Sequence, residues 1–290
     1  YTLGSFILLK KFFDRLKKEG WEDMVKYKIE KERLLFDNKA LAALIIPLII
    51  EQLLAVFVGM ADSIMVASVG EAAVSGVSLV DNIMILFINA FAALATGGAV
   101  IAGQYLGQKN EKESCKAATQ MIWFITILSL IIMGCLYLAK WFILHVVFGQ
   151  IDADVMAHAN TYLLIVTASI PFIALYNGGA AIFRGMGNSK VSMQVSIIMN
   201  VINVTGNAVL IFVFHRGTEG VAIPTLVSRM IAAVLIISLL AQEKRIIHIE
   251  KSLRYRPDWR MIKRVLGIGI PNGLENSMFQ LGKIIVLSLV

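Results

Sequence analysis

Seven long apolar segments decide what this 290-residue chain can fold into. They lie at 42–67, 74–102, 117–144, 158–183, 191–214, 221–242 and 265–290. Each is long enough to cross about 30 Å of hydrocarbon at the helical rise of roughly 1.5 Å per residue. In lipid the backbone must satisfy its own hydrogen bonds, and a helix does so within one segment. The sequence therefore predicts an all-α, polytopic membrane protein.

Composition points to lipid rather than water around the folded chain. Hydrophobic residues make up 58% and charged residues 16%, whereas soluble domains carry about 25% charged residues. The two cysteines and four histidines show no metal-ligand spacing, and no nucleophile, phosphate-loop or dinucleotide motif occurs. We therefore expect no metal site and no enzymatic activity, since a membrane enzyme would need paired catalytic groups.

Lysine and arginine are distributed very unevenly among the connections. Ten precede the first apolar segment, and three, two and eight fall in the second, fourth and sixth connections, whereas the odd connections hold only Lys140 and Arg216. Because cytoplasmic loops are enriched in these residues, the pattern predicts a cytoplasmic amino terminus in a multi-pass protein of the cell (plasma) membrane. The net charge of +7 fits a surface facing anionic lipid and requires no nucleic-acid partner.

The lengths of the connections divide the chain into four parts. The basic amphipathic segment at 1–39 is expected to lie on the cytoplasmic surface, followed by a six-helix lobe at 40–242. A basic cytoplasmic linker at 243–264 then leads to a seventh helix at 265–290. Because the chain starts without methionine and ends inside an apolar run, we expect it to be part of a longer protein.

A short internal match favours a second lobe that begins with the seventh helix. Pro47 and Glu51 recur as Pro271 and Glu275 at an offset of 224 residues, with an isoleucine before each proline. Repeats related by an axis along the membrane normal are a common plan in transporters. The seventh helix is therefore predicted to be the first helix of the second lobe.

Two carboxylates lie within the first apolar segment. Glu51 and Asp62 are eleven residues apart, which places them within about 20° of each other on one helical face. An ionisable residue inside a spanning helix costs at least ~2.5–3.5 kcal/mol, so it usually faces the bundle interior and serves a function. The structural alternative is that Asp62 forms a cap or salt bridge near the outer end and Glu51 packs against a neighbouring helix.

In the sixth segment, Arg229 could pair with a carboxylate or snorkel to the outer interface, with snorkelling favoured.

Two helices carry stripes of polar residues at helical spacing. The fifth segment has Ser196, Asn200, Asn203 and Asn207, and the second has Ser78, Asn82, Asn89 and Thr96 with Asp81 beside them. Amides can hold membrane helices together for about 0.6 kcal/mol each, but two stripes with two carboxylates fit a hydrated cavity better. The predicted ion-coupling or substrate residues are Asp62, Glu51, Asn203, Asn207, Asn200 and Glu275, and the predicted polar cavity lining is Asn82, Asn89 and Gln52.

Several motifs, in order, resemble those of the multidrug and toxic compound extrusion (MATE) family of antiporters. They are Ile46-Pro47 followed by Ala61-Asp62-Ser63-Ile64-Met65-Val66, similar to "D-T-I-M-V"; Gly103 to Gly107, similar to "A-Q-x-x-G"; Phe183 to Lys190, similar to "R-G-x-G-x-T/S-K"; Asn203 to Phe212, similar to "N-x-x-x-D/N-x-x-L-I-F"; and Gly217 to Thr225, similar to "G-x-x-G-x-A-x-x-T". The match covers nearly everything from Ala40 to Val290. Where several family members carry an aspartate in the fifth helix this chain has Asn207, which implies a hydrogen-bonding or cation-coordinating role.

The resemblance implies a twelve-helix fold of two lobes, of which this chain holds the first lobe and the first helix of the second, with the rest of the second lobe missing here. It also implies a secondary active antiporter that exports small organic cations or drugs in exchange for protons or sodium ions, by alternating access. The coupling ion would be the only cofactor. In this mechanism Asp62 or Glu51 is shared by ion and cationic substrate, while Asn200, Asn203 and Asn207 supply neutral oxygens.

Two other functions are weighed against efflux. A lipid or saccharide flippase of the same superfamily should have a more cationic cavity to hold phosphates, and intramembrane aspartate and glutamate argue against it. A seven-helix receptor or sensor predicts an outward amino terminus, which the distribution of lysine and arginine contradicts.

Overall fold

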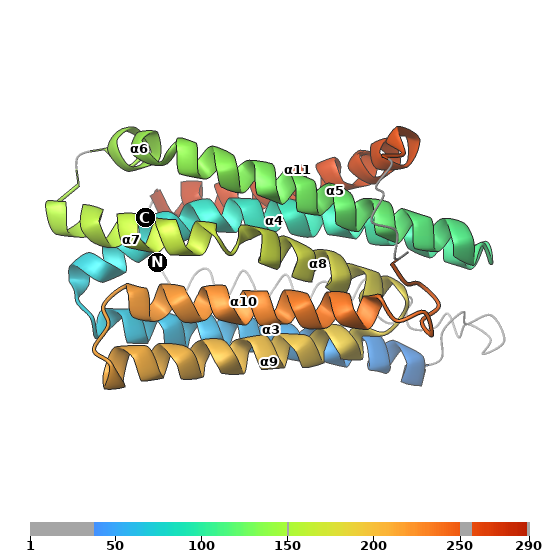
Figure 1. Cartoon of the computed structure of the whole chain (residues 1–290), viewed down its shortest axis with the longest axis horizontal. Coiled ribbons are helices and arrows are strands. Elements are labelled where there is room, and N and C mark those ends of the chain that lie inside the picture. Colours follow the sequence, from blue (N-terminus) through green and yellow to red (C-terminus); the bar gives the residue numbers. More distant parts are fainter. Residues whose placement is uncertain (1–37, 150, 250–256, 289–290) are drawn as a thin grey trace, which may run out of the picture. The chain divides into compact units, whose positions relative to one another are not determined.

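A computed structural model describes residues 38–149, 151–249 and 257–288, which form helices joined by short connections (Figure 1). Helices α3 (Asn38–Ala67), α4 (Glu71–Gly107) and α5 (Glu111–Leu138) correspond to the first three predicted segments. No strand occurs in the described ranges, so the all-α prediction is confirmed. The predicted basic segment at 1–39 lies outside the described residues except for its last two, which begin α3.

The fourth predicted segment is a bent pair of helices instead of one. Helix α7 (Ala153–Thr167) and helix α8 (Ile170–Gly185) meet at an angle of 48°. Pro171 lies at the start of α8, where a missing backbone N–H costs no helical hydrogen bond. Before α7 come the short helix α6 (Lys140–Phe142) and the π-helical turn η2 (Ile143–Val147).

The last part of the described chain contains three long helices. These are α9 (Ser189–Ala208), continued by the π-helical turn η3 (Val209–Val213), α10 (Glu219–Leu240) and α11 (Trp259–Ser288). Across the described residues, α3, α4, α5, α9 with η3, and α10 are long and apolar enough to cross a membrane, and α7 and α8 meet the same criterion when the bent pair is counted as one span. Because α11 begins at Trp259, residues 259–264 of the predicted linker are helical.

Within the compact unit at 43–290, helix α4 is packed against α5, α7, α8 and α11, and α10 is packed against α7, α8 and α9 (Figure 1). Large apolar side chains point outward from several helices, among them Phe57, Ile64, Leu138 and Val213. Contiguous exposed apolar surface is unusual for a protein in water but normal for helices that contact lipid. The polar residues that line the cavity described below lie on the inward faces.

Several glycines allow neighbouring helices to come unusually close, and two of them show the effect. A Cβ on Gly206 of α9 would lie 2.7 Å from Cβ of Pro224 on α10. A Cβ on Gly97 of α4 would lie 2.5 Å from the carbonyl oxygen of Val265 on α11. Small residues at such contacts are typical of membrane helix pairs. The contact at Gly206 sets the spacing between the two helices that carry much of the polar site.

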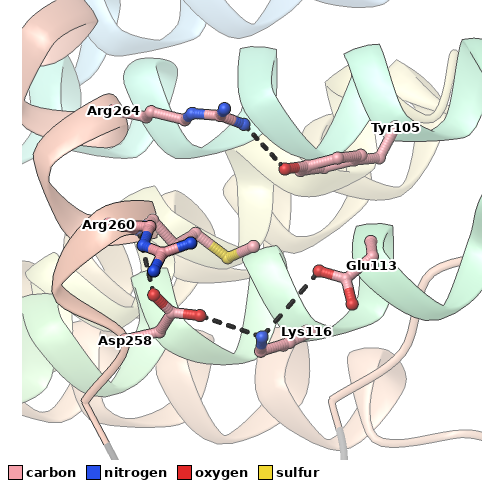
Figure 2. A pocket seen from close by; sticks show the side chains of 7 residues that line it. Tyr105, Glu113, Lys116, Asp258, Arg260 and Arg264 are labelled. Atoms are coloured by element: carbon pink, nitrogen blue, oxygen red, sulfur yellow. Dashed lines mark hydrogen bonds and ion pairs between the residues drawn. The ribbon is translucent and has the colours of Figure 1, made fainter.

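The start of α11 is fastened to α4 and α5 by polar contacts (Figure 2). Asp258 accepts hydrogen bonds from Nζ of Lys116 at 2.9 Å and from the backbone N–H of Met261 at 3.3 Å. Arg264 donates to the hydroxyl of Tyr105 at 2.8 Å. The hydrogen bond from Lys116 holds the pKa of Asp258 below its usual range, so this contact stays charged at neutral pH. These residues line an open pocket of about 460 Å³. Its two carboxylates, Glu113 and Asp258, both pair with Lys116, which indicates a structural role.

Candidate functional site

A cavity of about 450 Å³ lies among α3, α4, α7, α8, α9 and α10. Part of its wall is apolar, including Met84, Ile85, Ile88, Ile173 and Met199. The polar residues that line it are Asp62, Asp81, Tyr162, Asn200, Asn203, Thr225, Ser228 and Arg229. An apolar cavity with a few converging polar groups is the usual form of a small-molecule site. This cavity is therefore the strongest candidate in the described part of the chain.

A chain of hydrogen bonds connects Asp62 of α3 to α9 and α10. Nδ2 of Asn207 donates to Oδ1 of Asp62 at 2.7 Å and to Oδ1 of Asn203 at 3.4 Å. Nδ2 of Asn203 in turn donates to the hydroxyl of Thr225 at 3.0 Å, and that hydroxyl donates to the carbonyl of Val221 at 2.8 Å. Each donor in the chain therefore fixes the next acceptor, and Asp62 is held in one position against α9.

The amide oxygen of Asn207 has an unusual environment. Asn207 is completely buried, and its Oδ1 finds no hydrogen-bond partner among the described residues. A buried acceptor without a donor is costly, so it usually marks a place for an ion, a water or a ligand. Carboxylate, amide and hydroxyl oxygens together are ligands that suit hard cations. The surroundings of Asp62 therefore fit a proton or an alkali cation.

A second carboxylate, Asp81 of α4, lines the same cavity and was not among the predicted site residues. Its Oδ1 accepts a hydrogen bond from the hydroxyl of Tyr162 at 2.9 Å. A smaller cavity of about 140 Å³ also borders Asp62, Asp81 and Tyr162. The cost of an aspartate inside an apolar helix could have identified Asp81 from sequence. The predicted cavity lining instead included the amides of the polar stripe beside Asp81.

Arg229 of α10 lies in the cavity, so the favoured snorkelling position was wrong. Its Nη1 donates to Oγ of Ser169, at the break between α7 and α8, over 2.8 Å. Its charge interacts electrostatically with both Asp62 and Asp81. Sequence alone could not show this, because the side chain's direction depends on which helices pack beside α10.

Glu51 belongs to a separate polar cluster that fastens α3 to α8 and α9. Its carboxylate accepts hydrogen bonds from Tyr176 at 3.1 Å, from Arg184 at 3.4 Å and from Ser192 at 3.3 Å. The side chain of Glu51 is only 15% exposed, so these donors replace most of the water that would surround an exposed carboxylate. The structure thus places Glu51 and Asp62 in different surroundings, although both face the bundle.

We predict that Glu51→Gln and Arg184→Gln each lower the free energy of unfolding by about 1–3 kcal/mol, because each leaves a charged partner with weaker hydrogen bonds. The double variant should lose less than the sum, since both changes disrupt one contact. Thermal unfolding of the purified complete protein measures both effects. Gln52→Ala, at the exposed neighbouring residue, is the matched control. Additive losses in the double variant would show that Glu51 and Arg184 do not interact.

The remaining predicted residues lie outside the cavity around Asp62. Gln52 and Glu275 are exposed, and Asn82 lines a separate, open pocket near Asp152. Asn89 is partly buried but does not line the cavity. The structure therefore brings together Asp62, Asn200, Asn203 and Asn207. Gln52, Asn82, Asn89 and Glu275 lie apart from this group. The exposed position of Glu275 gives no support for pairing it with Asp62 in one site.

Comparison with known proteins identifies the family. A family model described as MatE matches residues 47–209, which is more than half of the chain. The uncharacterized transporter YisQ of Bacillus subtilis is 31% identical over 252 residues, covering 83% of this chain and 53% of YisQ. The probable multidrug resistance protein NorM of Thermotoga maritima is 23% identical and matches 90% of this chain and 56% of its own length. The chain spans about half the length of the curated relatives it matches.

Solved structures show the same fold. A crystal structure of MATE in the bent conformation has a TM-score of 0.77 at 21% identity, covering 85% of this chain and 55% of that one. The outward-facing conformation of a multidrug resistance MATE family transporter of the MOP superfamily has a TM-score of 0.74 at 22% identity, covering 86% and 56%. These structural matches confirm the predicted lobe architecture. The family model that matches residues 47–209 identifies the family. The chain belongs to the MatE family of membrane transporters.

Proposed function

We propose that the complete protein carrying this chain is a drug efflux antiporter that exchanges organic cations for protons or sodium ions. The observation that carries the proposal is Asp62, a carboxylate held by Asn207 in a cavity with apolar walls. Such a group attracts an organic cation and a coupling ion to the same place. Relatives named as probable multidrug resistance proteins support drug export as the biological role.

The proposed mechanism is competition for one carboxylate. When the cavity faces outward, a proton or sodium ion occupies Asp62 and the organic cation leaves. When it faces inward, the cation takes the place of the ion. A ligand shifts the equilibrium between the inward-facing and outward-facing states only if it binds one of them more tightly. Because Asp62 holds either the ion or the organic cation but not both, the movement of one is coupled to the movement of the other. The neutral oxygens of Asn203, Asn207 and Thr225 would help to replace the hydration shell of a sodium ion.

We further propose that the amino terminus is cytoplasmic and that the protein resides in the plasma membrane. The lysine and arginine distribution supports this orientation. It would place the basic start of α11, with Arg260, Lys263 and Arg264, on the cytoplasmic side next to anionic lipid. Reporter fusions after residue 39 and in the connection between α5 and α7 would test it. A reporter active outside the cell after residue 39 would contradict the orientation.

Transport in everted membrane vesicles tests the function itself. Vesicles that contain the complete protein are given either a proton gradient or a sodium gradient. Uptake of a fluorescent organic cation into the vesicles is then measured. We expect uptake with at least one gradient and loss of uptake when an ionophore dissipates that gradient. Equal uptake with and without gradients would contradict antiport, and the gradient that works identifies the coupling ion.

A further inference from the structure

Arg229 is a cation inside a cavity whose proposed task is to bind cations. It lies in α10, is partly buried, and lines the cavity together with Asp62 and Asp81. A buried guanidinium is costly, and such residues in membrane helices are usually paired. Within the described ranges, however, Arg229 forms no ion pair with a carboxylate. Its only side-chain hydrogen bond there goes to the neutral hydroxyl of Ser169.

The two carboxylates of the cavity already have neutral donors of their own. Asp62 accepts from Asn207 at 2.7 Å and Asp81 accepts from Tyr162 at 2.9 Å. Arg229 therefore acts on them through space and not through a hydrogen bond. A guanidinium has five N–H donors, and one is used by Ser169. The cavity thus presents both a negative pole and a positive pole to a ligand.

The arrangement of these poles suits one class of ligand. The carboxylates come from α3 and α4, whereas Arg229 comes from α10. The cavity wall also includes Ile85, Ile88 and Met199, which suit an apolar or aromatic body. An arginine binds a carboxylate with two parallel hydrogen bonds, which is the strongest pairing available to it here. A simple cation would satisfy Asp62 but would be repelled by Arg229.

We propose that Arg229 is a specificity-determining residue that binds a carboxylate of the substrate. The preferred substrates are then amphiphilic zwitterions, with the cationic end at Asp62 and Asp81 and the carboxylate at Arg229. The inference rests on the proposed function, because it takes the cavity to be the substrate site. It goes further by naming the chemical class that this cavity selects.

Binding of two matched dyes to the purified complete protein in nanodiscs tests the inference. The probes are a rhodamine with a free benzoate, which is zwitterionic, and its methyl ester, which is only cationic. Fluorescence anisotropy should show that the wild type binds the free acid at least about tenfold more tightly than the ester. This is the difference expected for one buried, charge-assisted hydrogen-bonded pair between Arg229 and the benzoate. Arg229→Gln should abolish this preference by weakening binding of the free acid, and it should bind the ester at least as tightly as the wild type, because the repulsion between Arg229 and the cation is gone.

The controls separate the possible outcomes. Arg216→Gln removes an exposed arginine outside the cavity and should keep the wild-type preference. Arg229→Lys retains the charge and should keep part of the preference even if Arg229→Gln is poorly folded. Equal binding of both dyes by the wild type, or no binding of either, overturns the inference. A preference that persists in Arg229→Gln overturns it as well. Gradient-driven export of the ester with no preference for the acid would leave the proposed function standing and reject only the role of Arg229.

Discussion

Asp62→Asn is expected to abolish gradient-driven efflux by the complete protein while leaving its folding intact. The substitution keeps the shape of the side chain, and its amide oxygen can still accept from Asn207, which lies 2.7 Å from Oδ1 of Asp62. It removes the negative charge that both the coupling ion and the organic cation are proposed to need. Since burial of a neutral amide costs less than burial of a carboxylate, stability should not fall.

The expected loss is large because Asp62 is the carboxylate proposed to bind the coupling ion, and the other carboxylate of the cavity, Asp81, is held by Tyr162 and is not part of the hydrogen-bond chain to α9. Efflux should drop at least about a hundredfold, equivalent to about 2.7 kcal/mol of lost coupling. Asp154→Asn, at an exposed aspartate in the first turn of α7, is the matched control and should transport normally. Transport in everted vesicles, normalised to the amount of folded protein, measures both. Wild-type efflux by Asp62→Asn would remove this residue from the mechanism.

Gly206→Val is expected to damage both stability and transport. A Cβ at this position would lie 2.7 Å from Cβ of Pro224, so α9 and α10 would have to separate. Overpacking of this kind typically costs about 1–3 kcal/mol. The separation would also stretch the hydrogen bond between Asn203 and Thr225, now 3.0 Å, and so disturb the support of Asp62.

The same substitution at Gly134 is a suitable control. Gly134 lies in the interior of α5, and a Cβ there would meet nothing within 4 Å. Gly134→Val should therefore unfold at nearly the wild-type temperature, whereas Gly206→Val should unfold several degrees lower. Thermal unfolding of the purified protein and efflux in vesicles provide the two measurements. Equal effects of the two variants would show that the contact between α9 and α10 does not depend on a glycine.

Much of the fold could be predicted from sequence because the bilayer leaves few choices to the backbone. Long apolar segments must be helices, and the first six predicted segments correspond to helices or to the bent pair of α7 and α8. The bend itself was not predicted as a break between two helices. It follows from local conformation near Ser169 and Pro171, which hydropathy alone does not report.

Within the site, the sequence predicted which residues lie on one face of the same helix. It did not predict which residues of different helices contact each other. The spacing of Asn200, Asn203 and Asn207 placed them on one face of α9, and the structure turns Asn200 and Asn203 toward the cavity and Asn207 toward Asp62. The partners Thr225 and Tyr162 come from α10 and α7. Helical periodicity states which face a residue occupies, but not which helix packs against that face.

The same limit explains the residues that sequence misplaced. Glu51 and Asp62 share a face of α3 as predicted, and α9 contacts both of them, yet Arg184 of α8 reaches only Glu51. The intramembrane position of Arg229 was evident, but its direction was decided by the cavity between α10 and its neighbours.

The central claim is that a coupling ion and an organic cation compete for Asp62. Its most direct test is the affinity of the purified complete protein for the esterified rhodamine, measured as proton or sodium concentration is raised. The wild type should bind the dye more weakly as the coupling ion increases, whereas Asp62→Asn should bind it weakly at all concentrations with no such dependence. Ion-dependent binding that is the same in Asp62→Asn and wild type would contradict the claim.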